Sequence, residues 1–292
     1  RPAAAIITRI LWLMLLVTLG GMPHAAQGAL LMPRQNLATY APAQWEKAFA
    51  LAAALPQAQR IAFWADLAAV GSRYVADPLG EGAGQTPDPQ PLCDYTHVDC
   101  MTFIEQVYAL SLSATVTDVA DRQRCIRYRD GIVAYRWRNH YLVSDWLPAN
   151  AWFIRDVTDE IGADTLTPMR KTIARAAFFA GKGLPEYGDV PDEQATTRYI
   201  PRKKMSQVLC ALHTGDLVIF VIDTPGIIAG HTGLLRVEHG VVYVQHASQT
   251  AGVVVTLPLT DYLRTAPARF VGCKIARPFL PTPAPPQNTL PG

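Results

Sequence analysis

The stretch that most constrains this chain is Val98–Glu105, which reads VDCMTFIE. It begins a predicted helix, because apolar residues recur at the spacing of one helical face: Cys100, Phe103, Ile104, Val107 and Leu110. Asp99 is a favourable N-cap residue, so Cys100 is expected in the first helical turn. Backbone N–H groups and the helix dipole favour a thiolate there, and a thiolate attacks carbonyl carbon. The alternative for a lone cysteine is a buried core residue.

Two histidines on neighbouring strands supply possible partners for this thiol. Strands are predicted over residues 231–237 and 241–248. With His239 and Gly240 as a two-residue loop, the better match to a tight turn, His231 faces Ser248 and His246 is its diagonal neighbour. A loop of Glu238 and His239 instead places His246 opposite His231. Both registers put the two histidines on one face, whereas a three-residue loop separates them. Together with Cys100 they form a possible nucleophile, base and orienting group.

The rest of the chain predicts an α+β fold. Residues 41–70 read as helix broken at Pro56, residues 120–128 as a short polar helix and residues 167–181 as a basic helix. Residues 182–204 read as a polar loop. The last third predicts an antiparallel sheet of about five strands and one short helix: strands 216–222, 231–237, 241–248, 252–257 and 270–276, and helix 259–265.

The two ends of the chain differ from its middle. Residues 1–28 resemble a secretory signal, with Arg1, Arg9, a short apolar run over 10–19 and small residues after it. The apolar run is too short to span a bilayer well. We therefore expect a signal peptide over 1–28, export to the periplasm or secretion, and no stable membrane anchor after cleavage. A single domain follows over 29–278 with an insertion around 114–204, and residues 279–292 are a Pro-rich tail outside the core.

Charge argues against nucleic acid as a partner. The chain has 26 Lys and Arg against 24 Asp and Glu. The expected signal peptide, residues 1–28, holds two of the basic residues and no acidic one. The remaining chain is therefore balanced at 24 against 24, without the basic field of a nucleic-acid binder.

Five cysteines are an odd number for an exported protein. If Cys100 is the free thiol, the other four can pair in three ways, which the sequence leaves open: Cys93, Cys125, Cys210 and Cys273. A zinc site is an alternative, since Cys93, His97 and Cys100 are close in sequence and His231 could join them. An oxidising compartment favours disulfides over thiolate clusters, so we expect no metal and no cofactor.

The segment 135–146 interleaves aromatic residues with Arg and His. Such side chains can stack on a sugar or hold a carboxylate, and they can equally form a structural surface patch. The candidates for substrate contact in this segment are Arg138, His140, Tyr141 and Trp146.

Four motifs in chain order carry a resemblance: Asp99-Cys100-x-Thr102-Phe103, Gly215-Asp216-Leu217-Val218, Gly230-His231-Thr232-Gly233-Leu234 and His246-Ala247-Ser248. They resemble the NlpC-type papain-like cell-wall hydrolases, and more specifically their N-acetylmuramoyl-L-alanine-amidase-like family. The similarity extends over roughly residues 60–278, through further matches at Tyr74, Pro78-Leu79, Arg138-x-His140-Tyr141, Asp145-Trp146 and Tyr262-Leu263.

This resemblance implies a papain-like fold, in which the helix bearing Cys100 packs on the antiparallel sheet. It implies a catalytic Cys100, His231 and His246, metal-free chemistry, and peptidoglycan or muropeptide fragments as substrate. Further residues are candidates for substrate contact: Tyr74, Asp99, Arg138, His140, Tyr141, Trp146 and Ser248.

We therefore expect an exported cysteine hydrolase that cleaves the N-acetylmuramoyl–L-alanine amide. A γ-D-glutamyl–diamino-acid endopeptidase of the stem peptide is one alternative. The Asp-Cys-Ser-Gly of NlpC-type enzymes reads Asp99-Cys100-Met101-Thr102 here, which favours the amidase. The other alternative is a non-catalytic wall-binding module, which would have no need of the Cys, His and His together.

Overall fold

The computed structural model describes residues 28–78, 93–187 and 189–279. The signal peptide expected over 1–28 and the tail expected over 279–292 lie almost wholly outside these residues, as does the loop 79–92 before the cysteine helix. Within the described ranges no helix has both the length and the apolar character needed to cross a membrane.

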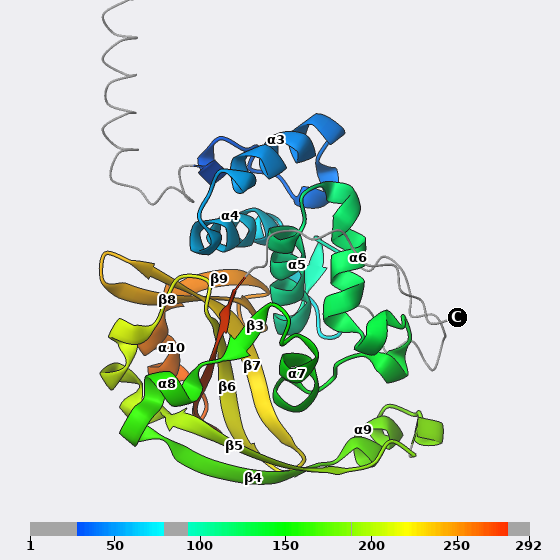
Figure 1. Ribbon diagram of the computed structural model, residues 1–292, viewed down its shortest axis with the longest axis vertical. Coiled ribbons are helices and arrows are strands. Elements are labelled where there is room, and N and C mark those ends of the chain that lie inside the picture. Colours follow the sequence, from blue (N-terminus) through cyan, green and yellow to red (C-terminus); the bar gives the residue numbers. More distant parts are fainter. Residues whose placement is uncertain (1–27, 79–92, 188, 280–292) are drawn as a thin grey trace, which may run out of the picture.

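A large, mostly antiparallel sheet forms the lower half of the molecule in Figure 1. Its ten strands run in the order β2-β1-β9-β8-β7-β6-β10-β5-β4, and β3 pairs with β10 beside this path. The strands are β1 (Arg73–Tyr74), β2 (His97–Val98), β3 (Ile154–Asp156), β4 (Thr167–Ile173), β5 (Glu193–Pro201), β6 (Leu217–Thr224), β7 (Ile227–Glu238), β8 (Val241–Ser248), β9 (Val253–Pro258) and β10 (Phe270–Pro278). Of the pairs in this sheet, β1 and β2 run parallel.

The α+β class and the five predicted strands are confirmed, as β6 to β10. The expected total of about five strands is wrong, because five more join the sheet. Residues 167–173 form β4 instead of the start of a helix, and the expected polar loop contains β5. These two strands pair over seven positions, from Thr167 with Tyr199 to Ile173 with Glu193, and burial alternates along β4. This long-range pairing outweighs the local helical pattern.

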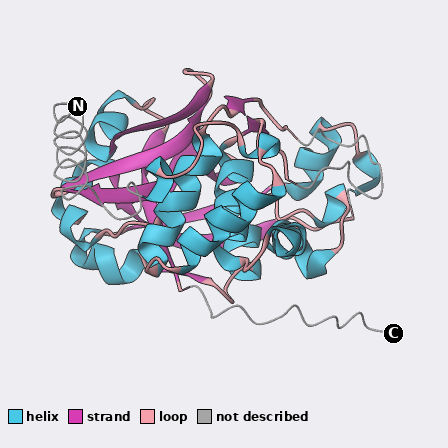
Figure 2. Cartoon of the chain, turned by 90° about the horizontal axis from the view of Figure 1, so that it is seen from above, coloured by secondary structure: helices cyan, strands magenta, loops and turns pink. Residues whose placement is uncertain are grey.

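Helices lie on both faces of the sheet (Figures 1 and 2), packed against Leu217, Ile219 and Leu234 on one face and against Val218, Phe220 and Val244 on the other. Their bounds are α3 (Pro42–Ala53), α4 (Gln57–Ala69), α5 (Cys100–Leu112), α6 (Val116–Arg127), α7 (Leu147–Ala149), α8 (Thr158–Gly162), α9 (Arg175–Gly181) and α10 (Leu259–Thr265). Pro56 stands between α3 and α4, so the predicted break in the first helical region is confirmed. The predicted polar helix is present as α6 and begins four residues earlier than expected.

Helix α5 is the centre of the main core, where Phe103, Ile104 and Val107 are fully buried. The same helix carries the buried carboxylate of Glu105, which is held by three donors. Arg127 Nε donates to Glu105 Oε2 over 2.7 Å, Gln123 Nε2 donates to the same oxygen, and Trp146 Nε1 donates to Oε1 over 3.1 Å. Because a buried charge is stable only when it is paired and hydrogen-bonded, this cluster fixes the insertion against the cysteine helix.

Candidate active site

Cys100 occupies the first position of α5, and the cap of that helix is built as the sequence predicts. Thr102 N donates to Asp99 Oδ1 over 2.7 Å, and Asp99 N donates to Thr102 Oγ1 over 2.9 Å. This reciprocal capping satisfies two backbone donors at the helix start. Asp99 is therefore engaged as the helix cap directly beside the thiol.

The hairpin of β7 and β8 brings the two histidine rings together. Leu234 pairs with Gln245 and Glu238 with Val241, so His239 and Gly240 form the two-residue loop. Both loop residues adopt left-handed backbone conformations, with φ of 48° and 79°, as this type of turn requires. The preferred register is thus confirmed.

In this register, His231 Nε2 lies 2.8 Å from His246 Nδ1. One ring nitrogen of His231 is therefore held by His246, which leaves Nδ1 as the nitrogen able to exchange a proton with another group.

Cys100 and His231 line one small cavity of about 100 Å³. The backbone N–H groups of Thr232, the residue after His231, of Cys100 itself and of Met101 lie near the Cys100 sulfur and act to lower its pKa. A sulfur atom surrounded by backbone donors beside an imidazole has the geometry expected of a nucleophile with its base.

Burial determines the protonation of the resting site. It raises the pKa of Cys100 to about 12, with a further contribution from Asp99, and outweighs the N–H donors that lower this pKa. Burial also lowers the pKa of His231 to about 3, assisted by His246, whose own pKa burial lowers to about 4. The N–H groups at the helix start thus favour the thiolate as expected, but burial opposes them more strongly and, on balance, favours a neutral thiol beside neutral imidazoles.

The rate of hydrolysis should consequently be insensitive to pH between roughly pH 5 and pH 9. His231 gains a proton, and is lost as a base, only as the pH falls toward about 3, while the thiol ionises only as the pH rises toward about 12. Alkylation of the Cys100 peptide by iodoacetamide, followed by mass spectrometry, should keep accelerating through pH 9, with exposed Cys210 as the internal reference. An alkylation rate that already levels off at neutral pH would reveal a thiolate–imidazolium pair instead.

Two aromatic rings that sequence reasoning did not assign to the site enclose the histidines. The Tyr262 ring lies 5.0 Å from His246 and 6.1 Å from His231, and Phe220 stacks on His231 at 5.8 Å. Tyr262 and Phe220 also contact each other at 4.4 Å. These rings desolvate the imidazoles, and the match at Tyr262-Leu263 was the only signal for either of them.

The candidates outside the triad divide into two groups. Tyr74 lies close enough to the thiol for the two groups to influence each other. Burial raises the pKa of the Tyr74 hydroxyl, and the charges of Cys100 and Asp99 raise that pKa further. Ser248 instead closes the turn after β8, where its Oγ accepts a hydrogen bond from Ala251 N over 3.2 Å.

The insertion contributes one wall of the cavity through His140 and Tyr141. His140 also lines an adjoining cavity of about 220 Å³, together with Arg138 and Asp99. Arg138 Nη1 lies 3.5 Å from Asp77 Oδ1. Trp146 is fully buried, so it supports the wall from the core and does not face a substrate.

All five cysteines are free thiols, so none of the three possible pairings is formed. Within the described ranges, no three or more His, Cys, Asp and Glu side chains are grouped so that they could hold a metal ion. The His97 ring instead pairs with Asp94 over 3.1 Å. The set proposed for zinc is therefore not assembled.

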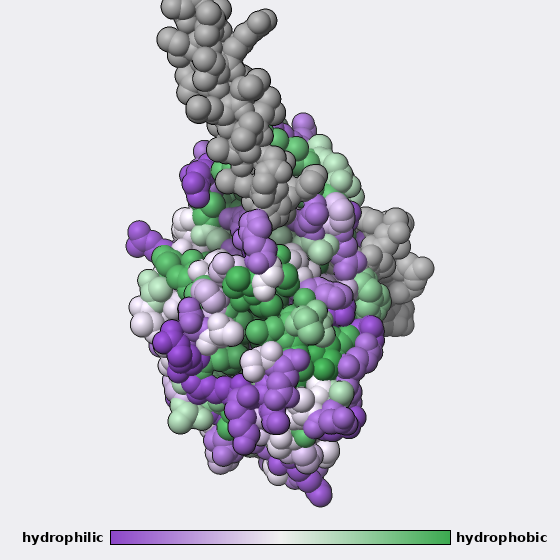
Figure 3. Space-filling model, turned by 90° about the vertical axis from the view of Figure 1, so that its left-hand side faces the viewer, coloured by the Kyte–Doolittle hydropathy of each residue, from purple (hydrophilic) through white to green (hydrophobic). Residues whose placement is uncertain are grey.

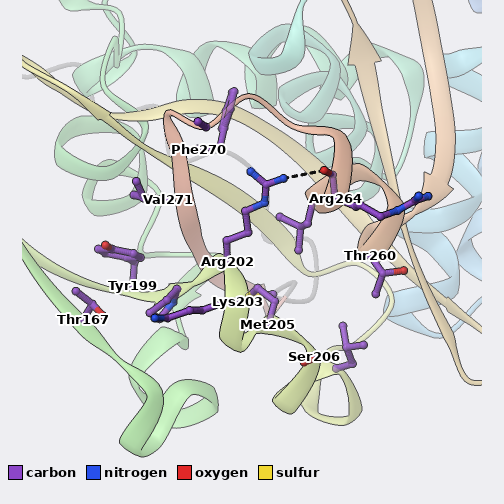
Figure 4. A pocket seen from close by; sticks show the side chains of 14 residues that line it. Thr167, Tyr199, Arg202, Lys203, Met205, Ser206, Thr260, Arg264, Phe270 and Val271 are labelled. Atoms are coloured by element: carbon purple, nitrogen blue, oxygen red, sulfur yellow. Dashed lines mark hydrogen bonds between the residues drawn. The ribbon is translucent and has the colours of Figure 1, made fainter.

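A larger groove of about 830 Å³ lies away from these residues, between the 199–209 segment, α10 and the start of β10 (Figure 4). Apolar side chains gather on the face shown in Figure 3, which is the side of α10 and β8 in Figure 1. Arg202 lies in the groove but donates to the carbonyl oxygens of Arg264 and Ala266, and Arg264 pairs with Asp261. Arg202 and Arg264 are thus bonded within the protein, and the residues that line the groove include no His or Cys, unlike those of the small cavity.

Solved structures with a similar fold come from several bacteria. A Legionella pneumophila protein is 19% identical, with a TM-score of 0.72 over 82% of this chain and 94% of its own. An N-acetylmuramoyl-L-alanine amidase from Bacteroides uniformis is 25% identical, with a TM-score of 0.59 over 71% of this chain and 93% of its own. A putative xylanase from Bacteroides fragilis is 24% identical, with a TM-score of 0.61 over 73% of this chain and 99% of its own. A search of curated proteins found no match.

The family model described as AmiA-like, N-acetylmuramoyl-L-alanine amidase-like, matches residues 66–271. This range contains Cys100, both histidines and the whole insertion. The chain therefore belongs to the N-acetylmuramoyl-L-alanine amidase-like family.

Proposed function

We propose that this chain is an exported cysteine hydrolase that cleaves the amide between N-acetylmuramic acid and L-alanine in peptidoglycan. The observation that carries the proposal is the 2.8 Å bond between His231 Nε2 and His246 Nδ1, beside a cavity that His231 shares with Cys100. A helix bearing the thiol against a sheet bearing the histidines is also the arrangement expected of a papain-like hydrolase.

In the proposed mechanism, Cys100 Sγ attacks the amide carbonyl carbon while its proton passes to His231 Nδ1. For this, neutral His231 must carry its proton on Nε2, where the N–H donates a hydrogen bond to His246 Nδ1. That hydrogen bond fixes the orientation of the His231 ring. The oxyanion is stabilised by the Cys100 backbone N–H at the helix start. His231 then protonates the leaving amine as the carbon–nitrogen bond breaks and a thioester forms. Water attacks the thioester while its proton passes to His231. Collapse of this intermediate releases the carboxylic acid and the Cys100 thiolate, which takes the proton back from His231.

A neutral thiol and a neutral imidazole in the resting site are consistent with transfer of the Cys100 proton to His231 only after substrate has bound. Closing a substrate over the cavity keeps water out, so the thiol loses its proton only as the new carbon–sulfur bond forms. The aromatic rings of Phe220 and Tyr262 maintain this dry environment around the imidazoles.

Family membership supports the muramoyl–alanine bond as the target. The insertion supports it as well, because His140 and Tyr141 extend the wall beside Cys100. Fewer aromatic side chains are available for sugar binding than the sequence suggested, because Trp146 is buried in the core.

One observation favours the alternative, an endopeptidase that recognises a free L-alanine amine. Asp77 and Asp99 give the cavity next to the site an acidic lining that attracts an ammonium group, although Asp77 already pairs with Arg138 and Asp99 Oδ1 caps α5. Asp94, a further acidic residue before the helix, instead accepts hydrogen bonds from Thr96 N and pairs with the His97 ring.

Product analysis distinguishes these two bonds. From a disaccharide-tetrapeptide, the proposed amidase releases free disaccharide and intact tetrapeptide, which mass spectrometry identifies directly. Release of the L-Ala-D-Glu dipeptide, or of a disaccharide that still carries it, would assign the endopeptidase activity. The Cys100→Ala protein serves as the blank for spontaneous hydrolysis.

We also propose export to the periplasm or secretion, supported by the signal-like composition of residues 1–28. Peptidoglycan lies outside the cytoplasmic membrane, so the leader and the proposed substrate agree.

A further inference from the structure

A cavity next to the catalytic one is lined by several arginine side chains that the proposed mechanism does not use. Its volume is about 160 Å³, and it is called the arginine cavity below. His140 and Tyr141 line both this cavity and that of Cys100, and His140 also lines the adjoining cavity of about 220 Å³. The three cavities therefore lie next to one another around His140. The charged residues in the lining of the arginine cavity are Arg129, Arg136, Arg138, Arg175, Asp145 and Asp189.

Three of these four guanidinium groups are paired with carboxylates of the protein itself. Arg175 is buried and donates to both oxygens of Asp145, over 2.8 and 2.6 Å. The other pairs join Arg175 to Glu193, Arg136 to Asp189 and Arg138 to Asp77.

Arg129 differs from the other three arginines. Its side chain is 51% exposed, and its ion-pair partner in the described part of the chain is Asp145, whose Oδ1 atom lies 3.9 Å away. This distance is too long for a hydrogen bond, and the same oxygen already accepts one from Arg175 over 2.6 Å. The N–H groups of Arg129 are therefore accessible at the mouth of the cavity and are not used by Asp145.

The position of the Arg129 guanidinium is set by an aromatic ring. Its central carbon lies 6.0 Å from the centroid of the Trp137 ring, and that of Arg136 lies 5.9 Å from the same ring. A backbone bridge between Tyr128 and Arg138 joins the residues that adjoin Arg129 and Trp137 in sequence. A guanidinium held against a ring keeps its N–H edge free for a planar anionic group.

From these observations we propose that the arginine cavity is a subsite for the stem peptide, in which Arg129 binds a carboxylate group beyond the L-alanine residue. A guanidinium recognises a carboxylate through two parallel hydrogen bonds. The stem carries such groups, because γ-linked D-glutamate keeps its α-carboxylate and the last residue has a free carboxyl end. This inference rests on the proposed hydrolase function.

The length of the stem agrees with this placement. Four peptide residues extend over at most about 14 Å from the amide that Cys100 attacks. The arginine cavity shares His140 and Tyr141 with the catalytic cavity, so a substrate bound at Cys100 has to cross only the adjoining space to reach it.

The test combines a change of charge in the protein with a change of charge in the substrate. The full chain is assayed on a disaccharide-tetrapeptide and on the same compound with its stem carboxylates converted to primary amides. Wild type should hydrolyse the acid with a kcat/KM roughly tenfold above that of the amide. Arg129→Gln should lose roughly tenfold on the acid and stay within about twofold of wild type on the amide, whereas Arg129→Lys should keep part of the preference.

A binding measurement separates recognition from turnover. In a Cys100→Ala background, Arg129→Gln should weaken the Kd of the acid by a similar factor and leave the Kd of the amide within about twofold.

Arg155→Gln is the matched control, since it removes the same charge at a side chain that is 52% exposed and pairs with Glu160. Arg155 lines none of the three cavities. This variant should keep both rates and the preference for the acid.

An equal loss on both substrates in Arg129→Gln would overturn the inference, because Arg129 would then support the cavity wall instead of binding a carboxylate. The inference also fails if wild type shows no preference for the acid, or if Arg129→Gln retains that preference. In each of these cases the proposed function stands. Absence of hydrolysis of both substrates by the wild-type protein would instead overturn the proposed function, and the inference with it.

Discussion

Replacing Cys100 with Ala should abolish hydrolysis of muropeptides, with a loss on the order of 10⁴-fold or more in kcat/KM. The substitution removes the sulfur that forms the bond to carbon, and no neighbouring side chain can take its place. The fold should persist, because the cap of α5 is made by Asp99 and Thr102 and one small residue replaces another. Digestion of purified disaccharide-tetrapeptide, followed by mass spectrometry, measures the loss, and circular dichroism checks the fold.

Cys210→Ala is the control for this experiment, since Cys210 is an exposed free thiol outside the cavity. It should retain wild-type turnover and wild-type melting temperature. Wild-type turnover in Cys100→Ala would disprove cysteine catalysis, and the two histidines would then need another explanation.

The second large effect is expected from the histidine pair. His231→Ala should lose nearly as much activity as Cys100→Ala, because members of a cooperating set are not additive. His246→Ala should retain roughly 10²-fold more activity than His231→Ala, since an orienting group is partly replaced by water. His246→Asn should recover part of the loss, because an amide oxygen can accept the Nε2 proton of His231. The measurement is kcat/KM for each variant on one muropeptide.

His239→Asn provides the matched control on the same hairpin. His239 is exposed in the turn and has a left-handed backbone with φ of 48°, which Asn tolerates. Its activity should equal that of wild type. If His246→Ala fell as far as His231→Ala while His246→Asn recovered nothing, His246 would take part in proton transfer instead of orienting the ring.

Local interactions explain what the sequence alone determined about this protein. The N-cap at Asp99 depends on residues three positions apart, and the approach of His231 to His246 depends on a two-residue turn, whose parity decides which side chains share a face. Such features need no knowledge of the rest of the chain. They were sufficient to predict the thiol at the helix start and the paired rings.

Only the tertiary structure decided the features that depend on distant packing. Strands β4 and β5 form because residues 167–173 pair with residues 193–199, which outweighs their local helical pattern. Trp146, an expected substrate contact, lies in the core instead, where its Nε1 donates a hydrogen bond to the buried carboxylate of Glu105. Burial, which no local pattern reports, raises the pKa of the Cys100 thiol and so favours its neutral form. Pairing partners and solvent exposure are properties of the assembled fold, so the sequence could name the candidate groups of the site but not their environment.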